Sequence, residues 1–463
     1  MLSQVRSLWA NKIASYQMEE DAKPIVSRFL DTSPMKRQLA RLDEVAAEGK
    51  KRIDYAVAHD PQVQKAIEVV ERFLRKTKRV CYGGQAINSL LPKEHQFYDE
   101  RYNIPDYDFF TPDVKGDVNQ LMKELESVGF DDVKKKVGIH DGTYKVYVNF
   151  IPVADCTEMD PGYFKILLKR AVSVGGIFYA DPDFLRMLMY LEISRPRGQL
   201  DRWRKVYERL SLLNREFPVG TCEKEISFHN GPGSEIRRKC LRFCMQNKRV
   251  VVGPDMIPVL EEGSGRLSLE KLVDVDAPVI FLSPQARLDA EDLMDILDIR
   301  LNKEVEAPLL TDLYEAQMIR HGRTPVALIF QENACHAYTM INKDMLRVGT
   351  PDLLLQIYYS VHIFGQKTPP FFPNDMECLL QKLHTITSQA RNSPTEFVPA
   401  FGVRCSGRQQ GFASLLKERE ARREAAAPKK GKGKRNVKLM RGGRRSTRRP
   451  KEPRRPRQTR RLR

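Results

Sequence analysis

The sequence lacks long hydrophobic runs and the cysteine spacing of a metal site. No stretch of 18 apolar residues occurs in its 463 residues, so no segment is predicted to span a membrane. The first twenty residues contain no continuous apolar core and end on Glu19 and Glu20, which argues against a secretory signal. The eight cysteines form no CxxC pair. We therefore expect no zinc site, and reduced thiols in an intracellular protein.

Positive charge is concentrated at one end of the chain. Residues 429–463 contain 18 Lys or Arg and a single acid, Glu452, whereas the other 428 residues carry 60 basic and 59 acidic side chains. So charged a segment is expected to be disordered. It has no aromatic residue to stack on bases, so we expect salt-sensitive, sequence-independent contact with RNA phosphates. A nuclear-localisation signal is the alternative.

The spacing of apolar residues divides the body into four regions and predicts an α/β (α+β) fold. Within the second region, strand and helix alternate twice and a hairpin of residues 133–139 and 144–153 follows. The predicted regions are an N-terminal helical region (1–60), an α/β domain (61–180), a helical segment (181–220), a second mixed domain (221–428) and the basic tail (429–463).

A short internal repeat suggests that the α/β unit is duplicated. Residues 78–87 (KRVCYGGQAI) and 248–257 (KRVVVGPDMI) share five of ten positions at an offset of 170. Chance similarity is the alternative for so short a match. In the second copy Pro254 replaces a glycine and so lacks the N–H that could face a phosphate. We therefore expect Asp274 and Asp276, which follow it, not to form a second active site.

Gly83 and Gly84 stand between a β-prone stretch and a helix-compatible one. Two glycines let the backbone approach a ligand closely, and the N-terminus of the following helix offers free N–H groups to a phosphate. A simple turn is the alternative interpretation.

Three aspartates follow the glycines. Asp106 and Asp108 are two residues apart, so on a strand their carboxylates project from one face. Asp155 lies at the end of a later predicted strand and could supply a third carboxylate to the same site. Asp141 and Glu158 are the alternative candidates for this third carboxylate. Repelling carboxylates are stabilised by divalent cations, and two such ions could activate a hydroxyl nucleophile and steady a leaving pyrophosphate. A solvated strand end is the alternative.

At these residues the sequence resembles the nucleotidyltransferase superfamily of DNA polymerase β. More narrowly, residues 82–88 (YGGQAIN) and 104–110 (IPDYDFF) are similar to the poly(A) polymerase catalytic subunit of large DNA viruses. Residues 184–187, 190–198 and 202–210 fit that family too, and the resemblance runs from about residue 60 to 400. The spacing of 22 residues from Gly84 to Asp106 is longer than in many superfamily members.

The resemblance implies a polymerase-β-like catalytic domain, a helical nucleotide-binding segment and a degenerate second nucleotidyltransferase-like domain. It implies that Asp106, Asp108 and Asp155 bind Mg²⁺ or Mn²⁺, and that Gly83 and Gly84 face the triphosphate of ATP. We expect polar residues of the glycine motif and of the helical segment to contact the nucleotide. The alternative for each of them is a position on the surface or a role in helix packing. These residues are Asn88, Arg186, Tyr190, Ser194, Arg195 and Lys205.

The sequence therefore predicts a template-independent polymerase that adds AMP from ATP to RNA 3′ ends in viral mRNA processing. We expect it in the host cytoplasm, at the viral factory, or in virions, and homodimeric members of the family make a homodimer an expectation. The alternatives are another terminal nucleotidyltransferase, adding uridylate or CCA, and a non-catalytic RNA-binding or processivity subunit on the same scaffold.

Overall fold

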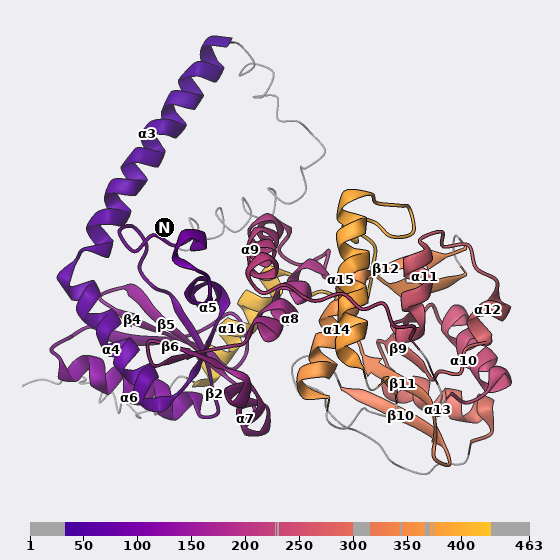
Figure 1. The fold of residues 1–463 in the computed structure, drawn as a ribbon. Helices are drawn as coiled ribbons and strands as arrows, with labels where there is room; N and C mark the ends of the chain where they lie inside the picture. The colour runs from indigo at the N-terminus through magenta and orange to yellow at the C-terminus, as the bar shows by residue number, and fades with distance from the viewer. Residues whose placement is uncertain are drawn as a thin grey trace, which may run out of the picture.

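The computed structural model describes residues 33–226, 228, 231–299, 315–342, 345–365, 371–373 and 375–426. These form two α/β units, each built on a seven-stranded sheet (Figure 1). The predicted basic tail lies outside the described residues. No helix within the described ranges is long and apolar enough to cross a membrane.

The first unit contains a mixed sheet in the order β3-β4-β5-β2-β1-β7-β6. Its core comes from β-branched and aromatic side chains such as Val80 and Phe109, neither of which is exposed to solvent. The strands are β1 (Val80–Tyr82), β2 (Tyr107–Thr111), β3 (Val133–Val137), β4 (Thr143–Val148), β5 (Ile151–Glu158), β6 (Val172–Val174) and β7 (Ile177–Tyr179).

The helices of this unit begin and end where local chemistry favours it. Asp60 caps the first turn of α4, and Pro61 occupies its first position. The helix ends at Lys78, which adopts a left-handed conformation with φ 53°. The helices are α3 (Ser33–Ala58), α4 (Pro61–Thr77), α5 (Gly83–Leu90), η1 (Lys93–His95), α6 (Val114–Ser127), α7 (Pro161–Arg170), α8 (Pro182–Ile193), η2 (Leu200–Arg202) and α9 (Trp203–Glu216).

The predicted hairpin is instead a meander of three strands. Asn149 and Phe150 both have positive φ, 49° and 69°, and form a tight turn that separates β4 from β5. Residues 144–153 were predicted as one strand because their apolar residues continue through this turn. As a result Asp155 lies inside β5, which pairs directly with β2.

The second unit repeats this architecture in residues 234–406, with a sheet in the order β10-β11-β9-β8-β13-β12-β14. Its strands are β8 (Val250–Val251), β9 (Val279–Ser283), β10 (Ala316–His321), β11 (Thr324–Gln331), β12 (His336–Ile341), β13 (Leu346–Gly349) and β14 (Cys405–Ser406). Its helices are α10 (Ser234–Gln246), η3 (Pro254–Met256), α11 (Ile257–Glu262), α12 (Leu269–Val273), α13 (Ala286–Leu297), α14 (Pro351–Phe364) and α15 (Met376–Asn392).

Strand pairing supports the duplication that the sequence repeat suggests. In both sheets the first strand, β1 or β8, pairs antiparallel with one neighbour and parallel with the other. A buried ion pair is also repeated. Arg79 donates to Asp117 of α6 at 2.5 Å, and Arg249 donates to Asp289 of α13 at the same distance. Each arginine precedes its strand, so both copies attach the strand to a helix in the same way.

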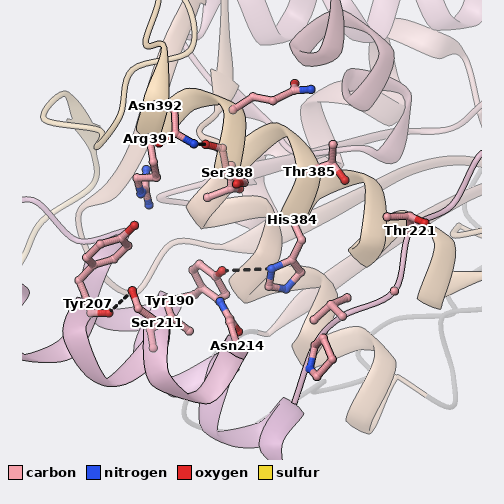
Figure 2. A pocket seen from close by; sticks show the side chains of 16 residues that line it. Tyr190, Tyr207, Ser211, Asn214, Thr221, His384, Thr385, Ser388, Arg391 and Asn392 are labelled. Carbon is pink, nitrogen blue, oxygen red and sulfur yellow. Dashed lines mark hydrogen bonds between the residues drawn. The ribbon is translucent and has the colours of Figure 1, made fainter. Parts of the chain in front are cut away.

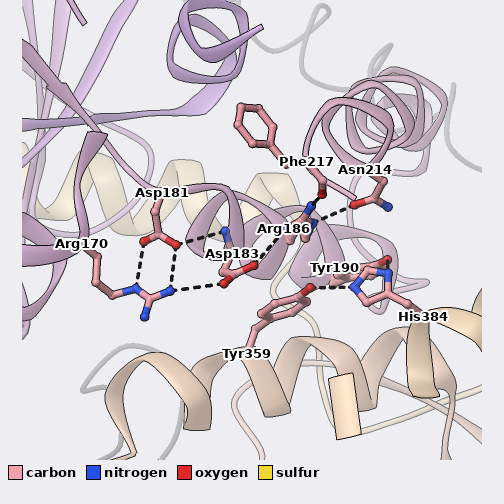
Figure 3. Close-up of polar contacts among 9 residues, drawn as sticks. All are labelled: Arg170, Asp181, Asp183, Arg186, Tyr190, Asn214, Phe217, Tyr359 and His384. Atoms are coloured by element: carbon pink, nitrogen blue, oxygen red, sulfur yellow. Dashed lines mark hydrogen bonds and ion pairs between the residues drawn. The ribbon is translucent and has the colours of Figure 1, made fainter. Parts of the chain in front are cut away.

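A chain of polar contacts joins the units through α8 (Figure 3). Arg186 of α8 is buried and donates to Asn214 of α9 at 2.8 Å and to Asp183 at 2.8 Å. On the other side His384 of α15 lies between the hydroxyls of Tyr359, at 2.7 Å, and Tyr190, at 3.5 Å. Helix α16 (Phe412–Ala426) then returns to the first unit, where Arg422 donates to the carbonyl of Ile139 at 2.9 Å (Figure 1).

The expectation of reduced cysteines was wrong for half of them. Disulfides join Cys222 to Cys378 and Cys335 to Cys405. The partners are 156 and 70 residues apart in the chain, so no short spacing signals the pairs. The other four cysteines are buried thiols.

Candidate nucleotidyl-transfer site

Strand register brings two of the predicted aspartates together. Asp108 of β2 pairs in register with Asp155 of β5 in the parallel ladder, and with Tyr82 of β1 in the antiparallel one. Register partners on adjacent strands project from the same face of a sheet. Asp106 lies two residues before Asp108, just outside the strand, and is exposed. All three carboxylates therefore face one region beside the end of β1.

The two glycines fit the space between this region and α9. Gly83 has φ 75°, and a Cβ at this position would lie 2.6 Å from Oδ2 of Asp108. A Cβ on Gly84 would lie 2.6 Å from both Nη1 of Arg209 and the hydroxyl of Tyr98. The glycines open α5, whose first turn has no side-chain cap. Its N–H groups are therefore available to an anion between the carboxylates and Arg209.

The carboxylates repel one another. Burial, together with the charges of Asp106 and Asp155, raises the pKa of Asp108 to about 7. Burial also raises the pKa of Asp155, against the lowering effect of its ion pair with Lys145 of β4. Burial lowers the pKa of Lys145, but its hydrogen bond to Asp155 and the nearby acids outweigh that effect and raise it overall. Mutual repulsion of this kind favours a bound cation.

Carboxylate oxygens are the ligands that Mg²⁺ and Mn²⁺ prefer, so the chemistry of these donors fits such an ion. The second oxygen of Asp155, Oδ1, is buried without a hydrogen-bond partner. In the described ranges, however, no three His, Cys, Asp or Glu side chains are arranged as a ready ligand cluster. Lys145 holds the other oxygen of Asp155, so this ammonium supplies positive charge where a divalent ion would.

Basic residues of η2 and α9 act electrostatically on the carboxylates and on one another. Arg202 forms an ion pair with Glu192 at 3.2 Å. Its positive charge partly offsets the rise in the pKa of Asp108 that burial and the neighbouring acids cause. Repulsion from Arg209, followed by burial and Arg202, lowers the pKa of Lys205, while Asp106 opposes that shift. This combination of carboxylates and cations suits a metal-bound polyphosphate.

The structure places the remaining predicted nucleotide contacts in different surroundings. Lys205 is exposed on α9, and the charge of Asp106 partly opposes the lowering of its pKa by Arg209 and burial. Arg195 follows α8 and donates to Asn333 of the second unit at 3.4 Å. Asn88 is buried, and its side-chain oxygen accepts from the backbone N–H groups of Phe97 and Tyr98 at 2.8 and 3.0 Å.

Arg186, Tyr190 and Ser194 lie buried in α8 and at its C-terminus, where they contact other protein groups, and Tyr190 also borders a cavity between α9 and α15. Arg186 and Tyr190 are buried in the junction with the second unit. Ser194 is not exposed to solvent at all, and its hydroxyl donates to the carbonyl of Leu191 at 3.4 Å. The sequence could not distinguish a contact with protein from a contact with a ligand. Polar residues on a helix have the same spacing in both cases.

Two residues of this region, Lys145 and Arg209, were missed by the sequence analysis. Lys145 reaches Asp155 across the β4–β5 ladder. Arg209 donates to the hydroxyl of Tyr98 at 2.7 Å and lies over the ring of Phe97, with its guanidinium carbon 4.6 Å from the ring centroid. Arg209 is four residues after Lys205, one helical turn, which is the signal that could have found it.

The second sheet has lost the acids. Aligning the register of β8 and β9 with that of β1 and β2 places Ile280 where Asp108 stands, and the β9–β11 ladder places Leu328 where Asp155 stands. Both side chains are fully buried. Asp276 lies before β9, where its Oδ1 accepts from the N–H of Gly231 at 2.8 Å. The corresponding position is therefore apolar, and the second unit is degenerate.

Comparison with known proteins agrees with the resemblance seen in the sequence. Residues 68–199 match the model of the family described as the poly(A) polymerase catalytic subunit. A protein of Acanthamoeba polyphaga mimivirus named "Putative poly(A) polymerase catalytic subunit" is 30% identical over 192 residues, 39% of this chain and 32% of that protein. A protein of the same name from African swine fever virus is 29% identical over 169 residues, 35% of each chain.

The aligned segment thus spans about a third of these relatives' length. The fold similarity extends further. The crystal structure of the Megavirus polyadenylate synthase superposes with a TM-score of 0.69 at 19% identity, covering 85% of this chain and 84% of that one. The family model matches the segment that carries Gly83, Asp108 and Asp155. The similarity to the solved structure extends over most of both units.

Proposed function

We propose that this chain is a template-independent polynucleotide adenylyltransferase, which adds AMP from ATP to the 3′ ends of RNA. The observation that carries the proposal is the register of Asp108 with Asp155 beside Gly83, at the uncapped N-terminus of α5. The family match over residues 68–199 supports this chemistry for the segment that holds all three aspartates. Polyadenylation of viral mRNA is the process that the relatives' names favour.

Asp106, Asp108 and Asp155 would hold two Mg²⁺ or Mn²⁺ ions. When bound, such ions lower the pKa of an attacking hydroxyl and neutralise the leaving pyrophosphate. Asp155 would hold an ion with Lys145 paired to one of its oxygens in the protein alone. An ion at this site would favour the ionised form of Asp108, whose pKa burial and the neighbouring acids raise to about 7.

The protein's own groups position the triphosphate and the RNA end. The N–H groups of Gly83 and Gly84 face the phosphates, and Lys205 and Arg209 contact them from α9. Positioning of the 3′-hydroxyl in line with the leaving pyrophosphate then requires no protein nucleophile. The bond from the α-phosphorus to the bridging oxygen breaks as the bond to the 3′-oxygen forms.

RNA and ATP are thus the proposed partners, with the basic tail adding contacts to RNA phosphates. Action in the host cytoplasm, at the viral factory or in the virion, and assembly as a homodimer, stay predictions from the resemblance. A non-catalytic subunit is disfavoured by the retention of Asp108, Asp155 and Gly83 in one copy, while the other copy has lost its acids.

The test is extension of a labelled RNA primer by purified protein with Mg²⁺ or Mn²⁺ and each nucleoside triphosphate in turn. We expect the primer to be extended further with ATP than with GTP, CTP or UTP. Extension with UTP alone, or with CTP followed by ATP, would assign a different terminal nucleotidyltransferase. No extension with any triphosphate, alongside intact RNA binding, would assign the non-catalytic role.

A further inference from the structure

A cavity of about 540 Å³, with both apolar and polar groups in its walls, lies between α9 and α15, at the junction of the two units (Figure 2). Its walls are formed by one face of α9, by the segment 218–221 and by one face of α15. Arg209 of α9 lies beside Gly84 of the nucleotidyl-transfer site, whereas positions 207, 211 and 214 line the cavity. At 100° per residue these three positions lie on the opposite side of the helix from Arg209, so the cavity is separate from the nucleotidyl-transfer site.

The lining of the cavity combines apolar and polar groups and carries almost no net charge. No acidic side chain is among its lining residues, all of which the structure describes. Arg391 lines it, but its guanidinium is neutralised by Asp352 at 2.6 Å. Burial, followed by the charge of Arg186, lowers the pKa of His384 to about 3, so its imidazole is neutral at physiological pH. A phosphate would therefore find no uncompensated cation here.

The available groups are instead hydroxyls and amides. Most of them come from one face each of α9 and α15, with Thr221 on the connecting segment (Figure 2). They are Ser211, Asn214, Thr221, Thr385, Ser388, Gln389 and Asn392. The hydroxyls of Ser211 and Thr385 already donate to backbone carbonyls, at 2.8 and 3.2 Å, and retain the capacity to accept. Together the groups offer both donors and acceptors, which matches the mixed edge of a heterocyclic base or the hydroxyls of a ribose.

Two flat groups border the cavity. The guanidinium carbon of Arg391 lies 5.5 Å from the centroid of the Tyr207 ring (Figure 2), and the guanidinium also packs on Phe401, 3.8 Å from that ring's centroid. Bases of single-stranded RNA stack on aromatic rings and on guanidinium planes. A volume of about 540 Å³ is also in the range of small-molecule sites.

The walls are fixed before any ligand arrives. Asn214 is held by Arg186 at 2.8 Å, and His384 by Tyr359 at 2.7 Å. The disulfide between Cys222 and Cys378 ties the segment after α9 to the first turn of α15. Fixed walls reduce the entropy that binding must overcome, so the cavity can select a rigid ring.

We propose that this cavity is a second nucleotide-recognition site, which takes one nucleobase with its ribose and leaves the phosphate in solvent. The base can come from a free nucleoside or from an RNA strand, and the chemistry of recognition is the same. In the latter case, which rests on the proposed function, the cavity holds an unpaired base of the substrate away from its reacting 3′ end.

The test uses Ser388→Trp, which fills the cavity, and measures RNA binding with Mg²⁺ present and no nucleoside triphosphate. The probes are fluorescein-labelled oligo(A), the same backbone with abasic residues, and free adenosine as competitor. We expect the wild type to bind oligo(A) more tightly than the abasic strand. In Ser388→Trp the Kd for oligo(A) should rise roughly ten-fold, close to that of the abasic strand.

Controls keep the outcome interpretable. Ser414→Trp places the same side chain on exposed α16 and should leave both Kd values unchanged, and Ser388→Ala should have a small effect. Equal affinity of wild type and Ser388→Trp for both oligo(A) and adenosine would overturn the inference. If Ser388→Trp loses affinity for adenosine and keeps its affinity for oligo(A), the occupant is a free nucleoside. If Ser388→Trp loses affinity for both adenosine and oligo(A), the occupant is a base of the RNA strand.

This measurement does not depend on catalysis. If the protein extends no primer but Ser388→Trp abolishes base-dependent binding, the cavity assignment stands and the polymerase proposal falls. If primers are extended while Ser388→Trp binds like the wild type, the cavity assignment falls alone.

Discussion

At the scale of single residues, the raised pKa of Asp108 makes stability depend on pH. Its pKa of about 7 in the folded protein exceeds the ordinary value of 3.8, so the folded state binds more protons between these two values. The stability that the protonated form contributes is complete below pH 4 and is lost as pH rises through 7. Divalent ions, which need the carboxylate, should bind more tightly as pH rises over the same range.

Asp108→Asn should therefore raise the Tm of the metal-free protein at pH 8 by a few degrees and leave it unchanged at pH 4. Thermal unfolding followed by circular dichroism checks this difference. Asp131→Asn, at an exposed carboxylate, is the matched control and should change neither value. Added Mg²⁺ should raise the Tm of the wild type and not that of Asp108→Asn. A lower Tm for Asp108→Asn at pH 8 would contradict the proposed repulsion.

Gly83 is required for space as well as for its backbone conformation. Gly83→Ala puts a Cβ 2.6 Å from Asp108 Oδ2, and Gly176→Ala, at φ 80°, meets only Arg75 carbons at 3.6 and 3.7 Å. Both substitutions should cost about 1–2 kcal/mol in unfolding free energy. Only Gly83→Ala should also reduce primer extension, by about 10²-fold, because it displaces a carboxylate. Equal activity of the two variants in a primer-extension assay would refute this role for Gly83.

The sequence alone predicted Gly83, Asp106 and Asp108 as site residues because their spacing in the chain carries the signal. Lys145 could not be found in that way, since its partner Asp155 is its neighbour across a ladder and not along the chain. Tyr190 and Ser194 were selected by residue type, which does not distinguish a ligand contact from the packed junction where the structure places them.

At the scale of elements, α9 carries basic residues of the candidate site. Lys205→Ala and Arg209→Ala should each raise the KM for ATP about ten-fold, because a hydrogen bond to a charged phosphate is lost. Arg204→Ala is the matched control, since this side chain is 91% exposed and pairs with Glu208. Steady-state kinetics at varied ATP tests the expectation. A KM that stays at the wild-type value in the Lys205 and Arg209 variants would remove α9 from the proposed site.

Element boundaries show what local patterns can predict. Helix α4 starts at Pro61, where Asp60 and the proline predict it, because a cap is a contact between near neighbours. The turn at Asn149 was missed because neither Asn149 nor Phe150 interrupts the apolar pattern of the two strands. The strand pairing of the second unit depends on contacts distant in sequence, so only the ten-residue repeat indicated it.

At the scale of the whole molecule, a nearly neutral body carries a strongly basic end, with 18 Lys or Arg in residues 429–463. Deleting these residues should raise the Kd for RNA at low salt, flatten its dependence on salt and shorten the products. Fluorescence anisotropy across a salt series, with gel analysis of product length, measures all three. A variant with the tail residues in scrambled order should behave like the wild type, because backbone contacts do not read sequence. An unchanged salt dependence after deletion would rule out this role.

Whole-molecule organisation was predictable in outline. Composition separated body from tail, and the repeat pointed to two related units, because both signals are contained in the sequence itself. The disulfides were not predictable, since Cys222 and Cys378 are 156 residues apart in the chain and no short spacing links them. The register that puts Ile280 and Leu328 at the acidic positions explains in structural terms why one unit is a candidate for catalysis and the other is not.

The most direct test compares the two units in one primer-extension assay with ATP. Asp108→Asn should lower the rate by on the order of 10²–10³ or more, because the transferred phosphate loses its electrostatic support. Asp276→Asn, whose carboxylate only accepts from the N–H of Gly231, should extend primers at the wild-type rate. A rate that survives Asp108→Asn, or falls equally in Asp276→Asn, would contradict the assignment of chemistry to the first unit.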